Sequence, residues 1–137
     1  MSQIIFASHG DLAKGMLHSL HMIVGDLTDD IETYGLYPGE HPNDYLEQLK
    51  QRISQSEEQF IILCDVLGGS VHTALSQLRQ YENVVLLSGM NLGMAMDVVL
   101  RYKSGVNQVD FPMILDNAKA GITLIHGALQ EESDEEF

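Results

Sequence analysis

The hydrophobic positions along the chain fall into two alternating patterns. Residues 3–7, 59–64 and 83–87 are short, almost unbroken apolar runs, which are typical of parallel strands covered on both faces. Residues 30–36 form a shorter mixed run, which suits an edge strand. After each run, apolar residues recur at the three- and four-residue intervals of an amphipathic helix. The pattern therefore predicts strands that alternate with helices.

Turn and capping residues mark where the helices are expected to begin. His41 is followed by a proline, which the first turn of a helix tolerates because its N–H is not needed there. Ser70 is a predicted N-cap for the helix after the third strand. Another helix is expected over residues 110–120, and residues 122–126 are expected to form a last short strand. The stripe expected to be buried in the first helix consists of Leu12, Met16, Leu20, Ile23 and Val24.

Strands interleaved with helices predict an α/β fold with a doubly wound, mostly parallel sheet and helices on both faces. We expect the strand order 2-1-3-4. A length of 137 residues suits one domain with a single core, which we place at residues 1–129. Residues 130–137 are rich in acidic side chains and are expected to be a disordered tail.

Composition and charge limit the functional classes. The chain has 45% hydrophobic and 20% charged residues, no apolar run near the roughly 20 residues that span a bilayer, and no export signal. Its one cysteine, Cys64, cannot form an internal disulfide, so a cytoplasmic location is expected. A net charge of −13 argues against nucleic-acid binding and favours a basic protein partner.

The expected strand order identifies a candidate site. With strands one and three as neighbours, ligands are expected in the crevice at their carboxyl ends, where the winding direction of the chain reverses. The residues that follow those strands are His9 and Asp65. A carboxylate that accepts a hydrogen bond from Nδ1 of a histidine leaves the lone pair of Nε2 free to attack. This pair therefore predicts a nucleophilic histidine.

Glycines and helix starts around this histidine favour an anion. Gly10, Gly68 and Gly69 allow the backbone to approach whatever His9 carries. The helices that begin after His9 and at Ser70 offer N–H donors and positive dipole ends, each worth roughly 0.3–1 kcal/mol toward a nearby anion. The chemistry that fits is acceptance of a phosphoryl group and its onward transfer, which depends mainly on positioning and charge stabilisation.

Other classes of function fit less well. A receiver domain phosphorylated on Asp65 is one alternative, but it needs acidic residues after the first strand to hold Mg²⁺, where this chain has a serine and His9. A flavodoxin-like nucleotide or flavin module is another, but the phosphate-binding glycine motifs are missing and no cofactor is expected. His18 and His21 are three residues apart without a third ligand at suitable spacing, so no metal site is expected.

Four short motifs lie at the turns that follow predicted strands. They are the Ser-His-Gly turn at 8–10, the Tyr-Pro-Gly-Glu turn at 37–40, the segment 65–70 with sequence Asp-Val-Leu-Gly-Gly-Ser, and Gly-Met-Asn-Leu at 89–92. Together they resemble the mannose-family IIA domains (EIIA type 4) of the bacterial phosphoenolpyruvate-dependent sugar phosphotransferase system. The resemblance covers the chain to about Leu129. Val71 and Gly93 depart from it, because many members have proline there.

The resemblance implies a phosphohistidine carrier. His9 would take phosphate from the phosphocarrier protein HPr and pass it to a IIB domain during sugar uptake. The membrane IIC and IID components would then be indirect partners of this chain. Asp65 would orient His9, and Ser70 with nearby backbone would contact the phosphoryl group. The family is dimeric with its last strand exchanged, so residues 122–126 are expected to pair with a second copy.

Contacts with partner proteins are expected at two of these turns, through Pro38 and Gly39 in one and Met90 and Asn91 in the other. The related dihydroxyacetone kinase phosphocarriers are the alternative within the same chemistry. They have a Met-Gly-Ser type loop where this chain has Gly68-Gly69-Ser70.

Overall fold

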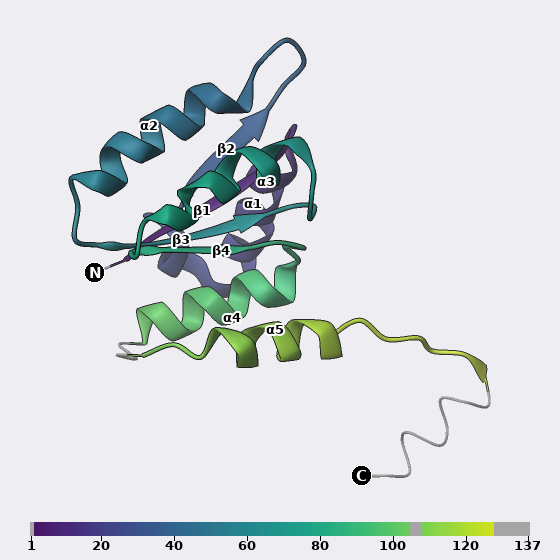
Figure 1. The fold of residues 1–137 in the computed structure, drawn as a ribbon. Coiled ribbons are helices and arrows are strands. Elements are labelled where there is room, and N and C mark those ends of the chain that lie inside the picture. The colour runs from purple at the N-terminus through teal and green to yellow at the C-terminus, as the bar shows by residue number, and fades with distance from the viewer. Residues whose placement is uncertain (1, 105–107, 128–137) are drawn as a thin grey trace.

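The computed structural model describes residues 2–104 and 108–127, which form an open α/β sheet with helices on both faces (Figure 1). In chain order the elements are β1 (Ser2–His9), α1 (Leu12–Val24), β2 (Glu32–Leu36), α2 (Pro42–Ser54), β3 (Gln59–Cys64), α3 (Ser70–Leu75), β4 (Val84–Leu87), α4 (Leu92–Lys103) and α5 (Phe111–Ala120). Two short 3₁₀ helices, η1 (Gly25–Thr28) and η2 (Ser76–Gln80), follow α1 and α3. The four strands are parallel in the order β2-β1-β3-β4, as the sequence predicts.

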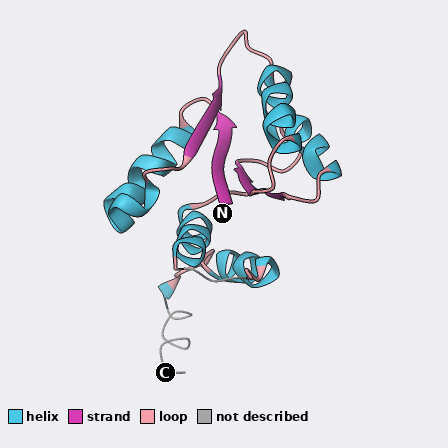
Figure 2. Cartoon of the chain, turned by 90° about the vertical axis from the view of Figure 1, so that its left-hand side faces the viewer, coloured by secondary structure: helices cyan, strands magenta, loops and turns pink. Residues whose placement is uncertain are grey.

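The sheet separates two hydrophobic cores. Alternate residues of the central strands point to opposite faces, so Ile4 and Phe6 lie in one core while Ile5 and Ala7 lie in the other. The first core is completed by α1, α4 and α5, and the second by α2 and α3. Figure 2 shows helices on both sides of the strands. Because β1 and β3 are covered on both faces, their sequences read as continuous apolar runs.

The buried face of α1 differs from the predicted stripe. Leu12 and Ile23 are 50% and 54% exposed, whereas Ala13 and Leu20 are fully buried. The face of α1 that meets the sheet is centred on Ala13 and Leu20, so Leu12 and Ile23 lie to one side of that face and remain largely exposed. The prediction for Leu20 is confirmed, and those for Leu12 and Ile23 are wrong.

The predicted last strand is not part of the sheet of this chain. After Gly121, residues 122–126 carry no strand pairing and run away from the body of the protein (Figure 1). The apolar side chains of Ile122, Leu124 and Ile125 are 76%, 78% and 73% exposed. The predicted exchange of this segment with a second copy of the chain stays a prediction. Residues 130–137, predicted to be a disordered tail, lie outside the described residues.

Candidate functional site

The sheet order brings the two predicted site residues together. His9 ends β1, and Asp65 follows β3, the strand beside it. Nδ1 of His9 lies 2.8 Å from Oδ2 of Asp65, and the same oxygen accepts a hydrogen bond of 2.8 Å from the backbone N–H of His9. The predicted adjacency of the two side chains is confirmed. The carboxylate thus fixes both the backbone and the ring of the histidine.

Asp65 is held as a charged acceptor. Its side chain is only 4% exposed, and its second oxygen, Oδ1, accepts a bond of 2.9 Å from the N–H of Val66. Burial alone would raise the pKa of this carboxyl group, but the hydrogen bonds from His9 and Val66 outweigh burial, and the pKa is lowered below its ordinary value. An ionised carboxylate can only accept, so the proton of the neutral imidazole lies on Nδ1.

The other nitrogen of the ring faces Ser70. The side chain of His9 is 48% exposed, and its Nε2 lies 3.0 Å from Oγ of Ser70. With the proton on Nδ1, Nε2 accepts a hydrogen bond from the serine hydroxyl. Ser70 is the first residue of α3 and not its N-cap as predicted, because Gly69 occupies the cap position. The serine side chain is therefore directed at the histidine and does not cap the helix.

The two glycines before Ser70 shape the loop around the imidazole. A Cβ at Gly69 would lie 3.2 Å from Cε1 of His9 and 3.4 Å from the carbonyl oxygen of Val66, so the loop packs directly against the ring. Gly68 has a φ of +78°, a conformation that side-chain-bearing residues rarely adopt. Its N–H donates a bond of 3.2 Å to Nδ1 of His72.

The opposite side of the histidine turn rests on the end of β2. Gly10, with a φ of +54°, donates its N–H to the carbonyl oxygen of Leu36 at 2.8 Å. A Cβ at Gly35 would overlap the carbonyl oxygen of Gly10. The hydroxyl of Tyr37 donates a hydrogen bond to Oδ1 of Asp11. These contacts tie the second strand to the turn that carries the candidate histidine.

Sequence reasoning missed the role of Gly35 and the contact between Tyr37 and Asp11. A glycine inside a strand pattern is a signal for close approach of another backbone, and it could have identified Gly35. The contact between Tyr37 and Asp11 joins two turns that are 26 positions apart, and no local pattern indicates it.

Ser8, just before the histidine, is a further structural link. It is fully buried, and its Oγ accepts a bond of 2.7 Å from the N–H of Ala13. Because this bond joins the first turn of α1 to the end of β1, the helix N-terminus is held beside His9.

The residues predicted to face partners lie in different environments. Pro38 and Gly39 are exposed at the tip of the loop between β2 and α2. Met90 is only 7% exposed and belongs to the core beneath α1 and α4, so its predicted exposure to a partner is wrong. An apolar residue in this turn gains more free energy in the core than it would at the surface. Asn91 is partly buried and caps α4, because its Oδ1 accepts a bond of 2.8 Å from the N–H of Met94.

The described residues contain neither a cluster suited to a metal ion nor a helix suited to a membrane. Within residues 2–104 and 108–127, no three histidine, cysteine, aspartate or glutamate side chains are grouped so that they could hold a metal ion. None of the helices in those ranges has both the length and the apolar character needed to cross a membrane.

Comparisons with known proteins give one family match and several similar proteins. Residues 3–113 match the family model for the PTS system fructose IIA component. The chain is 30% identical over 101 residues to a PTS system sorbose-specific EIIA component from Klebsiella pneumoniae. The aligned residues make up 72% of this chain and 73% of that protein.

Two solved structures are similar over most of their length. The PTS IIA protein associated with the fucose utilization operon from Streptococcus pneumoniae is 28% identical with a TM-score of 0.74, covering 90% of this chain and 92% of that one. The phosphotransferase system component EIIA from Streptococcus agalactiae is 28% identical with a TM-score of 0.77, covering 90% and 97%.

Proposed function

Because the chain belongs to the fructose/mannose family of PTS IIA components, we propose that Nε2 of His9 is the atom that carries the phosphoryl group. Membership implies phosphoryl transfer in sugar uptake. In the proposed reaction His9 accepts phosphate from phospho-HPr and passes it to a IIB component, which phosphorylates the sugar. The protein acts in the cytoplasm and meets the membrane IIC and IID components only through its partners.

The contact between Asp65 and Nδ1 of His9 is the observation that supports this assignment most directly. It leaves the lone pair of Nε2 available to attack the phosphorus of the donor. As the new N–P bond forms, the N–P bond of the donor histidine breaks and its electron pair returns to the donor ring. The positive charge that develops on the His9 imidazole is stabilised by the carboxylate of Asp65.

Ser70 and the glycine-rich loop complete the proposed phosphoryl site. The hydroxyl of Ser70, which donates to Nε2 before transfer, rotates to donate to a phosphoryl oxygen afterwards. Gly10, Gly68 and Gly69 keep the surroundings of the ring free of side chains, so that backbone groups can approach the phosphoryl oxygens. The positive end of α1, which begins three residues after His9, adds about 0.3–1 kcal/mol of stabilisation.

Phosphorylation of Asp65, the receiver-type alternative, conflicts with the geometry. Both of its oxygens already accept hydrogen bonds from His9 and Val66, and the side chain is almost inaccessible. An attacking oxygen needs a free path to phosphorus, which Asp65 lacks.

The test is transfer from labelled phosphoenolpyruvate through enzyme I and HPr to wild-type protein, to His9→Ala and to His18→Ala, a control histidine exposed on α1. We expect one acid-labile, base-stable phosphate per chain in the wild type and in the control. His9→Ala is expected to take up none. Full labelling of His9→Ala, or a base-labile phosphate, would overturn the assignment. Chase of the label by a IIB component tests the second half of the relay.

We also propose that residues 122–126 pair with a second copy, giving a homodimer. Support comes from the exposure of three apolar side chains on a segment that has no strand partner among residues 2–104 and 108–127. Light scattering should give a dimer for the full chain and for a chain ending at residue 127. A chain ending at residue 121 should be monomeric. A dimer that persists in the shorter chain would refute the exchange.

A further inference from the structure

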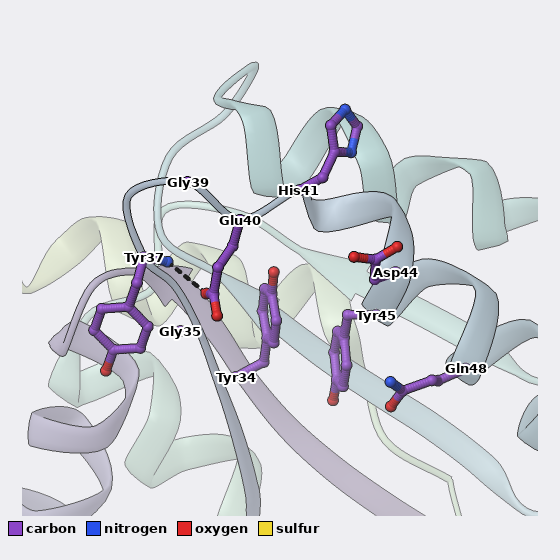
Figure 3. A pocket seen from close by; sticks show the side chains of 9 residues that line it. All are labelled: Tyr34, Gly35, Tyr37, Gly39, Glu40, His41, Asp44, Tyr45 and Gln48. Atoms are coloured by element: carbon purple, nitrogen blue, oxygen red, sulfur yellow. Dashed lines mark hydrogen bonds between the residues drawn. The ribbon is translucent and has the colours of Figure 1, made fainter.

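A polar hollow of about 570 Å³ lies between the end of β2 and the first turns of α2, beside the edge of the sheet (Figure 3). We call it the Tyr34 pocket. Its lining consists of Tyr34, Gly35, Tyr37, Gly39, Glu40, His41, Asp44, Tyr45 and Gln48. His9, Asp65 and Ser70 are not among these lining residues, and nothing in the proposed phosphoryl transfer uses the pocket.

One wall of the Tyr34 pocket is a rigid aromatic surface. The rings of Tyr34 and Tyr45 stack with centroids 4.2 Å apart and planes within 3° of parallel. Tyr45 is buried, and its hydroxyl donates to Glu32, which also pairs with Arg52 at 2.9 Å. Because this cluster holds Tyr45 from behind, Tyr34 is fixed before any ligand arrives. A preorganised aromatic ring loses little entropy on binding.

Two carboxylates give the pocket a negative potential. Figure 3 shows Glu40 and Asp44 on either side of the end of Tyr34 that carries the hydroxyl. Burial raises the pKa of the Tyr34 hydroxyl, and the negative charges of Glu40 and Asp44 raise it further. Both carboxylates therefore act on the same point in the pocket, where a cation would be stabilised and an anion repelled.

Basic side chains of the same helix do not neutralise these charges. Arg52 pairs with Glu32, and Lys50 pairs with Glu47 at 3.4 Å. Among the described residues, no lysine or arginine forms an ion pair with Glu40 or Asp44. The pocket thus combines an aromatic ring, two carboxylates and an amide, Gln48, with the positive charge left for a ligand to supply.

The Tyr34 pocket is connected to the histidine on two sides. Gly35 and Tyr37 line it and also support the turn after His9, through the close approach to Gly10 and the bond to Asp11. A second hollow of about 480 Å³ shares His41 with it and extends to Ser70, whose hydroxyl lies against Nε2 of His9. The two hollows are therefore neighbours on the surface, and a protein that reaches His9 across the second hollow comes close to the Tyr34 pocket.

We propose that the Tyr34 pocket receives a basic side chain, a guanidinium or ammonium group, of a protein that exchanges phosphate with His9. This inference rests on the proposed function. A cation over an aromatic face beside carboxylates gains both cation–π and charge-assisted hydrogen-bond energy. The net charge of −13 steers a basic partner surface toward this chain, and the pocket fixes where one of its side chains docks.

The chemistry of the pocket is tested without any partner. N-acetyl-arginine amide is titrated into the ¹⁵N-labelled chain, with the neutral isostere N-acetyl-citrulline amide as ligand control. We expect saturable shifts centred on the amides of Gly35, Tyr37 and Glu40 with the arginine probe only. The double variant Glu40→Gln/Asp44→Asn should abolish them, whereas Glu82→Gln/Asp116→Asn, which removes the same charge from exposed positions elsewhere, should not. Equal shifts with both probes, or no shifts, would overturn the inference.

Transfer kinetics test the partner. At low ionic strength, we expect Glu40→Gln/Asp44→Asn to raise KM about tenfold for HPr or for the IIB component, since contacts away from the reacting atoms act on encounter and docking. The increase should shrink in high salt. The charge-matched control should retain the wild-type KM for both proteins.

An unchanged KM for both proteins refutes the docking role while His9 still labels, so the proposed function would survive. If the wild type takes no phosphate on His9, the proposed function fails, and the docking role fails with it. The arginine titration then still reports whether the pocket binds a basic group.

Discussion

Replacing Asp65 by asparagine tests whether this carboxylate prepares His9 for attack. The side chain accepts three hydrogen bonds, two at Oδ2 from His9 and one at Oδ1 from Val66. Asparagine has the same shape but only one acceptor atom. In one orientation the NH2 group of the asparagine faces the N–H of Val66. In the other it faces the backbone N–H and Nδ1 of His9. The second orientation forces the imidazole proton onto Nε2, the atom that must be free to attack.

The size of the effect follows from these contacts. A hydrogen bond to a charged group contributes about 1.5–3 kcal/mol, which corresponds to roughly a 10- to 150-fold change in rate. Because the ring of His9 is 48% exposed, water screens part of the lost charge, and the lower half of that range is expected. We therefore expect Asp65→Asn to slow phosphoryl transfer from HPr about 10- to 50-fold.

Rapid-quench measurement of the first turnover, with enzyme I and HPr in excess, gives this rate. Asp116→Asn, which removes a charge from the exposed face of α5, is the matched control and should transfer at the wild-type rate. Imidazole ¹⁵N shifts should show Nδ1 protonated in the wild type and a mixed population in Asp65→Asn. A variant with the native fold, a wild-type rate and the wild-type tautomer would refute the orienting role of Asp65.

Three further changes test how the site and the core are built. Gly35→Ala should destabilise the protein by about 1–3 kcal/mol in urea unfolding and reduce labelling of His9, because the added methyl group overlaps the carbonyl oxygen of Gly10; wild-type values for both would contradict this packing. Leu49→Ala should lower the free energy of unfolding by about 2–5 kcal/mol, since the side chain is fully buried against the sheet; a loss below 1 kcal/mol would be inconsistent with that burial. Burial raises the pKa of Glu32, but hydrogen bonds from Arg52 and Tyr45 outweigh it and lower the pKa below the ordinary 4.5, so its contribution to stability is present above that pH and is lost as the pH falls through the lowered pKa. Unfolding of Glu32→Gln should therefore depend less steeply on pH below about 4.5 than that of the wild type, and equal slopes would show that the pair does not stabilise the fold.

Local patterns in the sequence determined the architecture and the central pair of the site. Continuous apolar runs identified β1, β3 and β4, because strands covered on both faces must be apolar at every position. The strand order then placed His9 and Asp65 at one edge of the sheet. Each residue is recognisable from its own surroundings, since His9 is the last residue of one strand and Asp65 directly follows another.

Packing between distant segments decided the remainder. No periodicity shows that Gly35 lies against Gly10, that Tyr37 bonds to Asp11, or that Ser70 turns toward His9 instead of capping α3. These contacts depend on how closely β2 and α3 approach the histidine turn, which only the assembled sheet defines.

The same limit explains the wrong prediction at Met90, and it applies to the last segment as well. A turn position indicates exposure, but Met90 is 7% exposed and belongs to the core that α1, α4 and α5 complete. Residues 122–126 have the composition of a strand, yet a strand also needs a neighbour, and none of the residues that the structure describes pairs with this segment. Composition determines what a segment is able to form, and the tertiary structure decides which partner, if any, it finds.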